Sequence, residues 1–218
     1  MTGDAGTPGP ADHGWPVLES RTEYETGWYD GGYDLVELPD GRTKRYYWAE
    51  LPPAVVIVAV VEDPARLGPD AEHRRIDGTD LVSADRAPAG PSVVFVEQYR
   101  PAIGRLCHEL PAGIVEDGED YADAGARELE EEVGIVPESV ELLEDFWCST
   151  GVLRHPRGIV WAEGFSRGER KLDGSEFLDV VTVPVEEALE LARAAPANDA
   201  TIEGLLLAQA DGNLPSGI

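Results

Sequence analysis

The amino-acid sequence predicts an α/β (α+β) fold, in which helices surround a mixed β-sheet. Two continuous apolar runs, AVVIVAVVE at 54–62 and SVVFVEQYR at 92–100, are typical of buried strands. Segments with helical spacing of apolar residues follow at 118–134 and near the C-terminal end. The 218 residues, with a hydrophobic content of 42%, suffice for one domain with a core and a small appendage.

The first part of the chain divides into a polar tail and a small β-rich unit. Residues 1–14 are rich in Gly, Pro and Asp, and we expect them to be disordered. Residues 15–52 are predicted to form an N-terminal β unit. Within it, ELPDGRTKRYYWAEL places a Pro-Asp-Gly turn between two strand-like runs, which predicts a hairpin.

The main domain, residues 53–212, starts with the apolar run at 54–62. Residues 63–91 are polar, carry several turn signals and show little periodicity, so we interpret them as an insertion or long loop. Its arginines could form a local anion site, but arginines that balance neighbouring acids in a solvated loop are the favoured interpretation. These residues are Arg66, Arg74, Arg75 and Arg86.

A helix is predicted at 118–134, after the strand at 92–100 and a tight loop with the sequence ELPAG. Asp117 is suited to cap its N-terminus and Gly134 to end it. Its buried stripe is expected to consist of Ala122, Ala126, Leu129 and Val133. Further strands are predicted near 139–148, 157–165 and 178–183, and further helices near 184–194 and 198–210.

The chain is strongly acidic, with a net charge of -26 and a pI near 4.3. This charge argues against nucleic-acid binding through a broad electrostatic patch, because the phosphate backbone would be repelled. Lys44 and Lys171 are the two lysines among 17 basic residues. Excess carboxylate with scarce lysine resembles the proteins of extreme halophiles, whose self-repulsion is tolerable when salt shortens the Debye length to about 3 Å at 1 M.

Other features predict a cytoplasmic protein that contacts no membrane. Two cysteines, Cys107 and Cys148, are too few for a disulfide scaffold and fit a reducing compartment. The N-terminal residues have neither the basic nor the apolar region of a signal peptide. The longest apolar run, 54–61, is too short to span a membrane.

The predicted helix concentrates negative charge in the segment ARELEEEVG. Glu128, Glu131 and Glu132 stand at i, i+3 and i+4, so they share one face, opposite the centre of the apolar stripe. Hard carboxylate oxygens on a rigid helix suit Mg²⁺ or Mn²⁺, and the cation would offset their mutual repulsion. The alternative is an ordinary solvated helix of an acidic protein.

The same stretch matches the Nudix box at every specified position. Gly113 is followed by five residues, Glu119, seven residues, Arg127-Glu128-Leu129-x-Glu131-Glu132-x-Gly134 and an aliphatic residue, Ile135. The chain therefore resembles the Nudix hydrolases. The resemblance implies an α/β/α sandwich around a mixed sheet, with the box as a loop–helix–loop. It also implies metal-dependent cleavage of a nucleoside diphosphate linked to another moiety.

The flanking segments resemble the ADP-ribose pyrophosphatase branch of that family. They are VEQYR, ELPAG, EFLDVVTVPVEEALELA and NDATIEGLLLA, and the resemblance runs from about Trp15 to Gln209 apart from 63–91. It implies hydrolysis of ADP-ribose to AMP and ribose 5-phosphate, by a homodimer that exchanges its N-terminal β unit. Alternatives are a nucleotide sugar, dinucleotide or oxidised nucleotide as substrate, or a module that binds ADP-ribose-like ligands without cleaving them.

The resemblance also assigns the metal site. A divalent cation, Mg²⁺ or Mn²⁺, would be held by the backbone carbonyl of Ala112 and the carboxylates of Glu128 and Glu132, with support from Glu131 and Glu109. Arg127 would orient the glutamates through charge-assisted hydrogen bonds. A metal-bound water would attack the diphosphate, and Glu176 would accept its proton.

Four further residues are candidates for substrate binding. Arg100 would hold a phosphate, although a structural salt bridge is the alternative. Trp28 and Trp48 resemble aromatic residues that sandwich adenine, and packing in the core or at a dimer interface explains them equally well. Arg45 would contact a phosphate from the partner subunit.

Two departures from the branch leave its finer assignments open. Ser149-Thr150-Gly151 replaces the usual Ser-Pro-Gly. The late loop LDGSEFLD carries fewer acids than usual, so Glu176 is the best match for the general base and Asp173 an alternative. The identity of the base and the preference for ADP-ribose therefore stay open.

Overall fold

A computed structural model describes residues 14–67, 71–77, 80–83, 90–174 and 176–215. The predicted disordered tail, apart from Gly14, lies outside these residues. The chain divides into two compact units, which are described separately. One comprises residues 1–54 and 145–157, and the other comprises residues 55–144 and 158–218.

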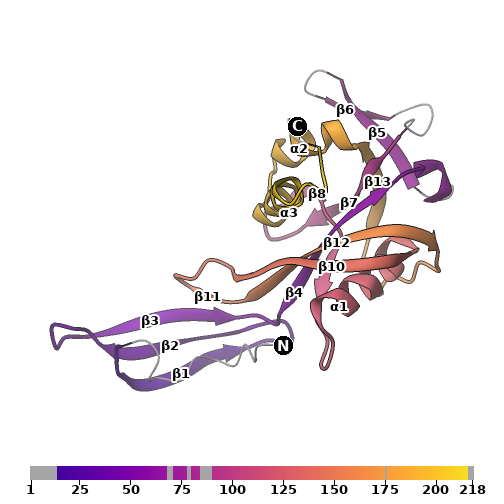
Figure 1. Cartoon of the computed structure of the whole chain (residues 1–218). Coiled ribbons are helices and arrows are strands. Elements are labelled where there is room, and N and C mark those ends of the chain that lie inside the picture. Colours follow the sequence, from indigo (N-terminus) through magenta and orange to yellow (C-terminus); the bar gives the residue numbers. More distant parts are fainter. Residues whose placement is uncertain (1–13, 68–70, 78–79, 84–89, 175, 216–218) are drawn as a thin grey trace. The chain divides into compact units, whose positions relative to one another are not determined.

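The first unit is built on a four-stranded sheet in the order β1-β2-β3-β11. Its strands are β1 (Val17–Glu25), β2 (Asp30–Glu37), β3 (Thr43–Glu50) and the short β11 (Leu153–Arg154). Strands β1, β2 and β3 are antiparallel neighbours, and β11 runs parallel to β3 (Figure 1). Gly41 adopts a φ of 81° in the turn between β2 and β3, where a side chain would be strained. The predicted hairpin is confirmed.

The second unit contains a nine-stranded sheet with the path β10-β12-β4-β7-β13-β5-β6. Strands β8 and β9 pair with β7 and β4 beside this path. The bounds are β4 (Ala54–Val61), β5 (Ala71–Asp77), β6 (Asp80–Ser83), β7 (Ser92–Arg100), β8 (Arg105–Glu109), β9 (Ala112–Ile114), β10 (Ile135–Trp147), β12 (Pro156–Arg167) and β13 (Leu178–Pro184). Because β13 is antiparallel to β7 and parallel to β5, the sheet is mixed, as predicted.

Residues 63–91 differ from the predicted irregular loop. They contain a short 3₁₀ helix, η1 (Pro64–Leu67), and the strands β5 and β6. Main-chain pairing with β13 holds β5 in place, and this pairing needs no apolar pattern in the sequence. The favoured interpretation, arginines that balance neighbouring acids, holds for two of them: Arg66 pairs with Asp63, and Arg74 pairs with Glu72 and Glu97. Arg86 lies outside the described residues.

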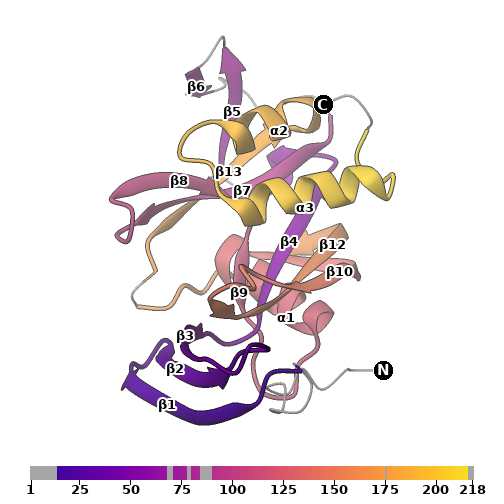
Figure 2. The ribbon, with the colours of Figure 1, turned by 90° about the vertical axis from the view of Figure 1, so that its left-hand side faces the viewer.

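Helices cover both faces of this sheet, which gives the predicted α/β/α arrangement (Figure 2). The helices are α1 (Tyr121–Glu128), which continues as the π-helical turn η2 (Leu129–Val133), α2 (Val185–Arg193) and α3 (Asp199–Ala210). Gly125 of α1 approaches Val55 and Ile57 of β4. Gly204 of α3 approaches Val58 of the same strand. Since neighbouring side chains of a strand point to opposite faces, α1 and α3 lie on opposite sides of β4.

The helix that carries the carboxylates differs in detail from the prediction. Asp120, not Asp117, caps it, because its Oδ1 accepts hydrogen bonds of 2.9 Å from the backbone amides of Ala122 and Asp123. Gly134 ends η2 with a φ of 79°, as predicted. Leu129 and Val133 are buried as expected, but Ala124 and Gly125 take the places predicted for Ala122 and Ala126, which are half-buried.

The remaining predicted strands and helices are present as β10, β12, β13, α2 and α3. Among the described residues, no helix combines the length and apolar character needed to cross a membrane.

Candidate active site

Arg127 joins three glutamates and a backbone carbonyl. Its guanidinium donates to Glu119 (2.9 and 3.0 Å), Glu128 (2.8 Å) and Glu131 (3.0 Å). It also donates to the carbonyl oxygen of Ile114 at 2.8 Å. The hydrogen bond from Arg127 lowers the pKa of Glu119, and these glutamates, Glu119 first, raise the pKa of Arg127. Arg127 thus pairs with several glutamates and fixes one edge of the carboxylate cluster.

Glu128 and Glu132 are buried carboxylates, with 9% and 6% of their surface exposed. The helix was expected to place them away from its apolar stripe, so their burial corrects that expectation. Burial raises the pKa of Glu128. It also raises the pKa of Glu132 to about 8, and the negative charge of Glu128 adds to this effect. Two ionised carboxylates in this place are costly unless a positive charge accompanies them.

The backbone of β9 lies directly against these carboxylates. The amide of Ala112 donates to Glu132 Oε2 at 3.2 Å. A Cβ atom on Gly113 would stand only 1.9 Å from Glu128 Oε1, so no other residue fits there without moving the carboxylate. The structure therefore brings together Ala112, Glu128 and Glu132, the three residues assigned as metal ligands.

Arg100 and Glu109, from the ends of β7 and β8, form an ion pair. The Nε atom of Arg100 donates to Glu109 Oε2 at 3.0 Å, and Nη2 donates to the same oxygen at 2.5 Å. This bond is the main cause of the raised pKa of Arg100, to which the charge of Glu132 contributes. The salt bridge foreseen as the alternative for Arg100 is thus present. Its phosphate-binding role stays a prediction.

The late loop brings Glu176 towards the buried pair. Its charge contributes to the raised pKa of both Glu128 and Glu132. Within the loop, Glu176 Oε2 accepts a hydrogen bond of 2.9 Å from the amide of Asp173. Sequence reasoning missed Arg170, which binds the backbone of this loop and of η2. No motif position marked it.

The donor atoms suit a divalent cation, although the side chains are not preassembled around one. Among the described residues, no group of three or more His, Cys, Asp or Glu side chains is arranged to hold a metal ion. Glu131 pairs with Arg127 and Glu109 with Arg100. Glu132, by contrast, accepts a hydrogen bond of 3.2 Å from the backbone amide of Ala112. A cation beside Glu132 and Glu128 would offset the penalty that raises their pKa values, so these residues fit the implied metal.

The candidate substrate aromatics belong to the first unit. Trp48 donates from Nε1 to Asp34 at 3.2 Å, and the guanidinium of Arg154 lies 4.1 Å from its ring centroid. Trp48 also lines a pocket of about 670 Å³ with the aromatic residues Trp15, Tyr46, Tyr47 and Trp147. Trp28 is 68% exposed, and the guanidinium of Arg45 lies over the ring of Tyr33. Neither Trp28 nor Arg45 lines this pocket.

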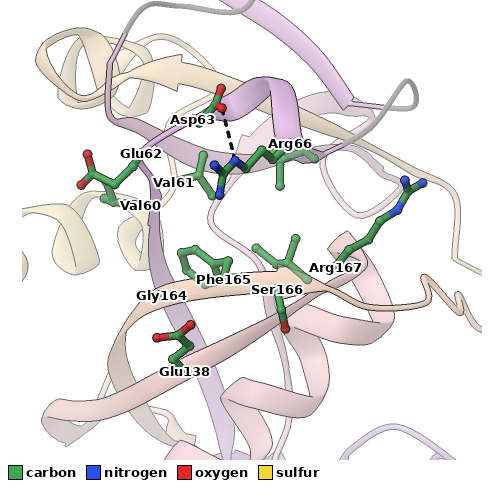
Figure 3. A pocket seen from close by; sticks show the side chains of 12 residues that line it. Val60, Val61, Glu62, Asp63, Arg66, Glu138, Gly164, Phe165, Ser166 and Arg167 are labelled. Carbon is green, nitrogen blue, oxygen red and sulfur yellow. Dashed lines mark ion pairs between the residues drawn. The ribbon is translucent and has the colours of Figure 1, made fainter.

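Figure 3 shows a second pocket, of about 550 Å³, in the second unit. Its walls come from the end of β4, from η1 and from parts of β10 and β12. Phe165 lies between the exposed Arg66 and Glu138 in this view, and Arg66 pairs with Asp63 at 3.3 Å. None of the predicted site residues lines this pocket, so it is separate from the candidate active site.

Comparisons with known proteins show what this chain is similar to. A model of the NUDIX domain matches residues 81–205. The chain is 31% identical over 159 residues to a methanol dehydrogenase activator of Bacillus methanolicus, covering 72% of this chain and 71% of the relative. It is 28% identical over 167 residues to an ADP-ribose pyrophosphatase of Bacillus subtilis, covering 76% of each. A solved structure of an ADP compounds hydrolase has a TM-score of 0.72 and 19% identity, covering 91% of this chain and 95% of that one, and thus shares the fold.

Proposed function

Because this chain belongs to the Nudix family, we propose that it hydrolyses the diphosphate bridge of ADP-ribose and releases AMP and ribose 5-phosphate. Family membership and the pyrophosphatases among its relatives make it a hydrolase of nucleoside diphosphate derivatives. The observation that carries the proposal is the placement of the buried Glu128 and Glu132 against the backbone of Ala112 and Gly113. ADP-ribose is favoured by the similarity to the Bacillus subtilis enzyme.

The metal proposed for this site is Mg²⁺ or Mn²⁺. The carbonyl of Ala112 and the carboxylates of Glu128 and Glu132 would hold it, with Glu131 and Glu109 in support. A divalent cation there supplies a water of lowered pKa and offsets the charge of the diphosphate. The hard oxygen donors and the burial of Glu132 support this choice.

The side chains of this enzyme have separate tasks in the proposed reaction. Arg127 holds Glu128 and Glu131 in fixed orientations through its hydrogen bonds. Arg100 binds a phosphate oxygen, for which it exchanges part of its pairing with Glu109. Glu176 accepts the proton of the attacking water, and Asp173 is the alternative acceptor in the same loop.

We further propose that the first unit recognises the adenosine part. The pocket beside Trp48 is aromatic, and one face of the Trp48 ring is already covered by Arg154. Trp28 offers an exposed ring for stacking, and Arg45 a cation for a phosphate. The exposed aromatic residues of this unit support a homodimer in which they are covered by the second subunit.

The proposed setting is a salt-rich cytoplasm. The net charge of -26 supports a halophilic origin, since salt screens the repulsion between carboxylates. Cys107 and Cys148 are buried thiols, which fits a reducing compartment.

The deciding experiment measures AMP release from ADP-ribose in molar KCl with Mg²⁺, beside nucleotide sugars, dinucleotides and 8-oxo-dGTP. Glu132→Gln tests the site, and Glu130→Gln is the matched control, because it removes the same charge from the same turn. We expect preferential cleavage of ADP-ribose that Glu132→Gln abolishes and Glu130→Gln retains. Preference for another compound would refute ADP-ribose as the substrate. Binding of ADP-ribose by a folded protein that cleaves nothing would identify a binding module instead.

A further inference from the structure

Arg170, in the loop between β12 and β13, binds two carbonyl oxygens from different elements. Its Nε donates to the carbonyl of Glu132, in η2, at 2.6 Å. Its Nη2 donates to the carbonyl of Leu178, the first residue of β13, at 2.5 Å. The side chain is half-buried. One guanidinium therefore connects the carboxylate-bearing turn to the far end of the late loop.

The position of Arg170 follows from the end of the helix. The last carbonyls of a helix have no amide partner within it, and the carbonyl of Glu132 is one of these. A guanidinium satisfies such a carbonyl and interacts favourably with the negative end of the helix dipole. Gly134 leaves room for it, since a Cβ atom there would stand 3.3 Å from the Cβ of Arg170.

Two main-chain hydrogen bonds reinforce the same connection. The amide of Gly168 donates to the carbonyl of Gly134, and the amide of Lys171 donates to the carbonyl of Glu131, both at 2.9 Å. The loop is thus hydrogen-bonded to η2 and its cap residue Gly134 at three successive points before it reaches Glu176. Leu178, the second anchor of Arg170, follows Glu176 by only two residues. Both ends of the segment that carries Glu176 are therefore attached to Arg170 or to its neighbours.

We propose that Arg170 is a positioning residue that sets the location of Glu176 relative to Glu128 and Glu132. Its two bonds go to carbonyl oxygens, so it acts on the backbone and not by neutralising a carboxylate. The planar fork of arginine holds its donors in fixed directions towards the two acceptors, whereas the ammonium group of lysine is a compact charge on a flexible stem. The kinetic consequence rests on the proposed function, whereas the connection between loop and turn can be tested without it.

The test compares Arg170→Met with Arg167→Met. The methionine at 170 keeps the apolar length and removes both donors. The control removes the same charge from an exposed side chain at the edge of the pocket in Figure 3. Three quantities are measured: amide hydrogen exchange of residues 168–178, the Kd for Mn²⁺, and kcat and KM for ADP-ribose.

In Arg170→Met we expect exchange of residues 168–178 to accelerate about tenfold while β4 is unchanged, because the loop opens locally. The Kd for Mn²⁺ should rise and kcat should fall, each by about 10- to 100-fold. The KM should stay within about threefold of the wild-type value. Arg167→Met should match the wild type in all three. Unchanged exchange and an unchanged kcat in Arg170→Met would overturn the proposal.

Arg170→Lys keeps the inference testable if the methionine variant does not fold. It retains the charge and at most one of the two bonds, so we expect an intact melting temperature with faster loop exchange and a lower kcat. A lysine variant identical to the wild type would show that charge alone matters and would refute the positioning role. Should the wild type cleave no compound of the panel, the proposed function fails, while exchange and Mn²⁺ affinity still decide on Arg170.

Discussion

Glu119 and Arg127 stand eight residues apart and form a two-point ion pair, with Arg127 Nε 2.9 Å from Glu119 Oε1 and Nη2 3.0 Å from Oε2. Glu119 precedes α1 and Arg127 lies in its last turn, so the pair closes the loop in front of the helix onto that turn. This pairing gives a physical reason for the eight-residue separation of Glu119 and Arg127 in the box. The remaining donor of Arg127, Nη1, is left to hold Glu128 and Glu131.

The first prediction concerns this ion pair. Arg127→Lys should lower kcat for the best substrate by about 100-fold, because lysine lacks the rigid fork whose separate nitrogens bind Glu119, Glu128 and Glu131. Stability should fall by about 1–3 kcal/mol, since the buried Glu128 and the partly buried Glu119 lose hydrogen bonds from a charged donor. Glu119→Gln should have a smaller effect, because it weakens one arm and leaves Nη1 in place. Kinetics and urea unfolding check this. Equal losses in both variants would contradict it.

The second prediction concerns the contact between β9 and α1. Gly113→Ala would place a Cβ atom 1.9 Å from Glu128 Oε1, so the carboxylate or the strand has to move. We expect Mn²⁺ affinity to fall by about tenfold or more, measured by titration calorimetry. Gly27→Ala serves as the control, because a Cβ atom there meets nothing within 4 Å. Equal Mn²⁺ affinity in the two variants would show that Gly113 does not position Glu128.

The third prediction concerns pH and the metal-free protein. The pKa of Glu132 rises from 4.5 to about 8 on folding, so the folded state holds this proton more tightly than the unfolded state. Its contribution to stability is complete below pH 4.5 and is lost as the pH rises towards about 8. The unfolding free energy therefore falls by at most about 1.4 kcal/mol for each pH unit in this range.

Urea unfolding in EDTA at several pH values checks this dependence. Glu132→Gln carries no titrating group at that position, so its stability should decline less between pH 5 and 8 and exceed that of the wild type at the upper end. Added Mg²⁺ should stabilise the wild type more than the variant at alkaline pH, by mass action on the folded state. Parallel pH profiles for the two proteins would rule out Glu132 as the cause.

The sequence predicted the elements whose side-chain pattern is strong. The runs at 54–62 and 92–100 became β4 and β7, and Gly134 ended the helix where its tolerance of positive φ allows. Strand β5 escaped prediction because its residues, among them Glu72 and Arg74, are polar and its place depends on pairing with β13, more than 100 residues away. Such non-local pairing leaves no local signal.

In the candidate site, too, the sequence predicted what depends on local patterns and missed what depends on contacts between distant segments. The box identified Arg127 and its glutamates, because a motif records fixed spacing along one helix. Helical periodicity could not indicate that Glu128 and Glu132 are buried, since β9, which lies against them, is a separate element of the chain. Arg170 was missed for a related reason: its partners are main-chain carbonyls, which every residue has. Contacts of this kind become visible only when the chain is folded.

The last prediction tests how tightly α1 packs on the sheet. A Cβ atom on Gly125 would lie 2.8 Å from Val160 Cγ2 and 3.4 Å from Ile57 Cγ1, and both side chains are fully buried. Alanine raises helix propensity by up to about 1 kcal/mol over glycine, but overpacking a rigid core costs about 1–3 kcal/mol. We therefore expect Gly125→Ala to lower the unfolding free energy by about 1 kcal/mol or more, measured by urea unfolding. Gly174→Ala, with open space around the added atom, should leave it nearly unchanged. A stabilised Gly125→Ala variant would mean that α1 can move away from β4 at little cost, and the separation between the carboxylates and the sheet would then be adjustable.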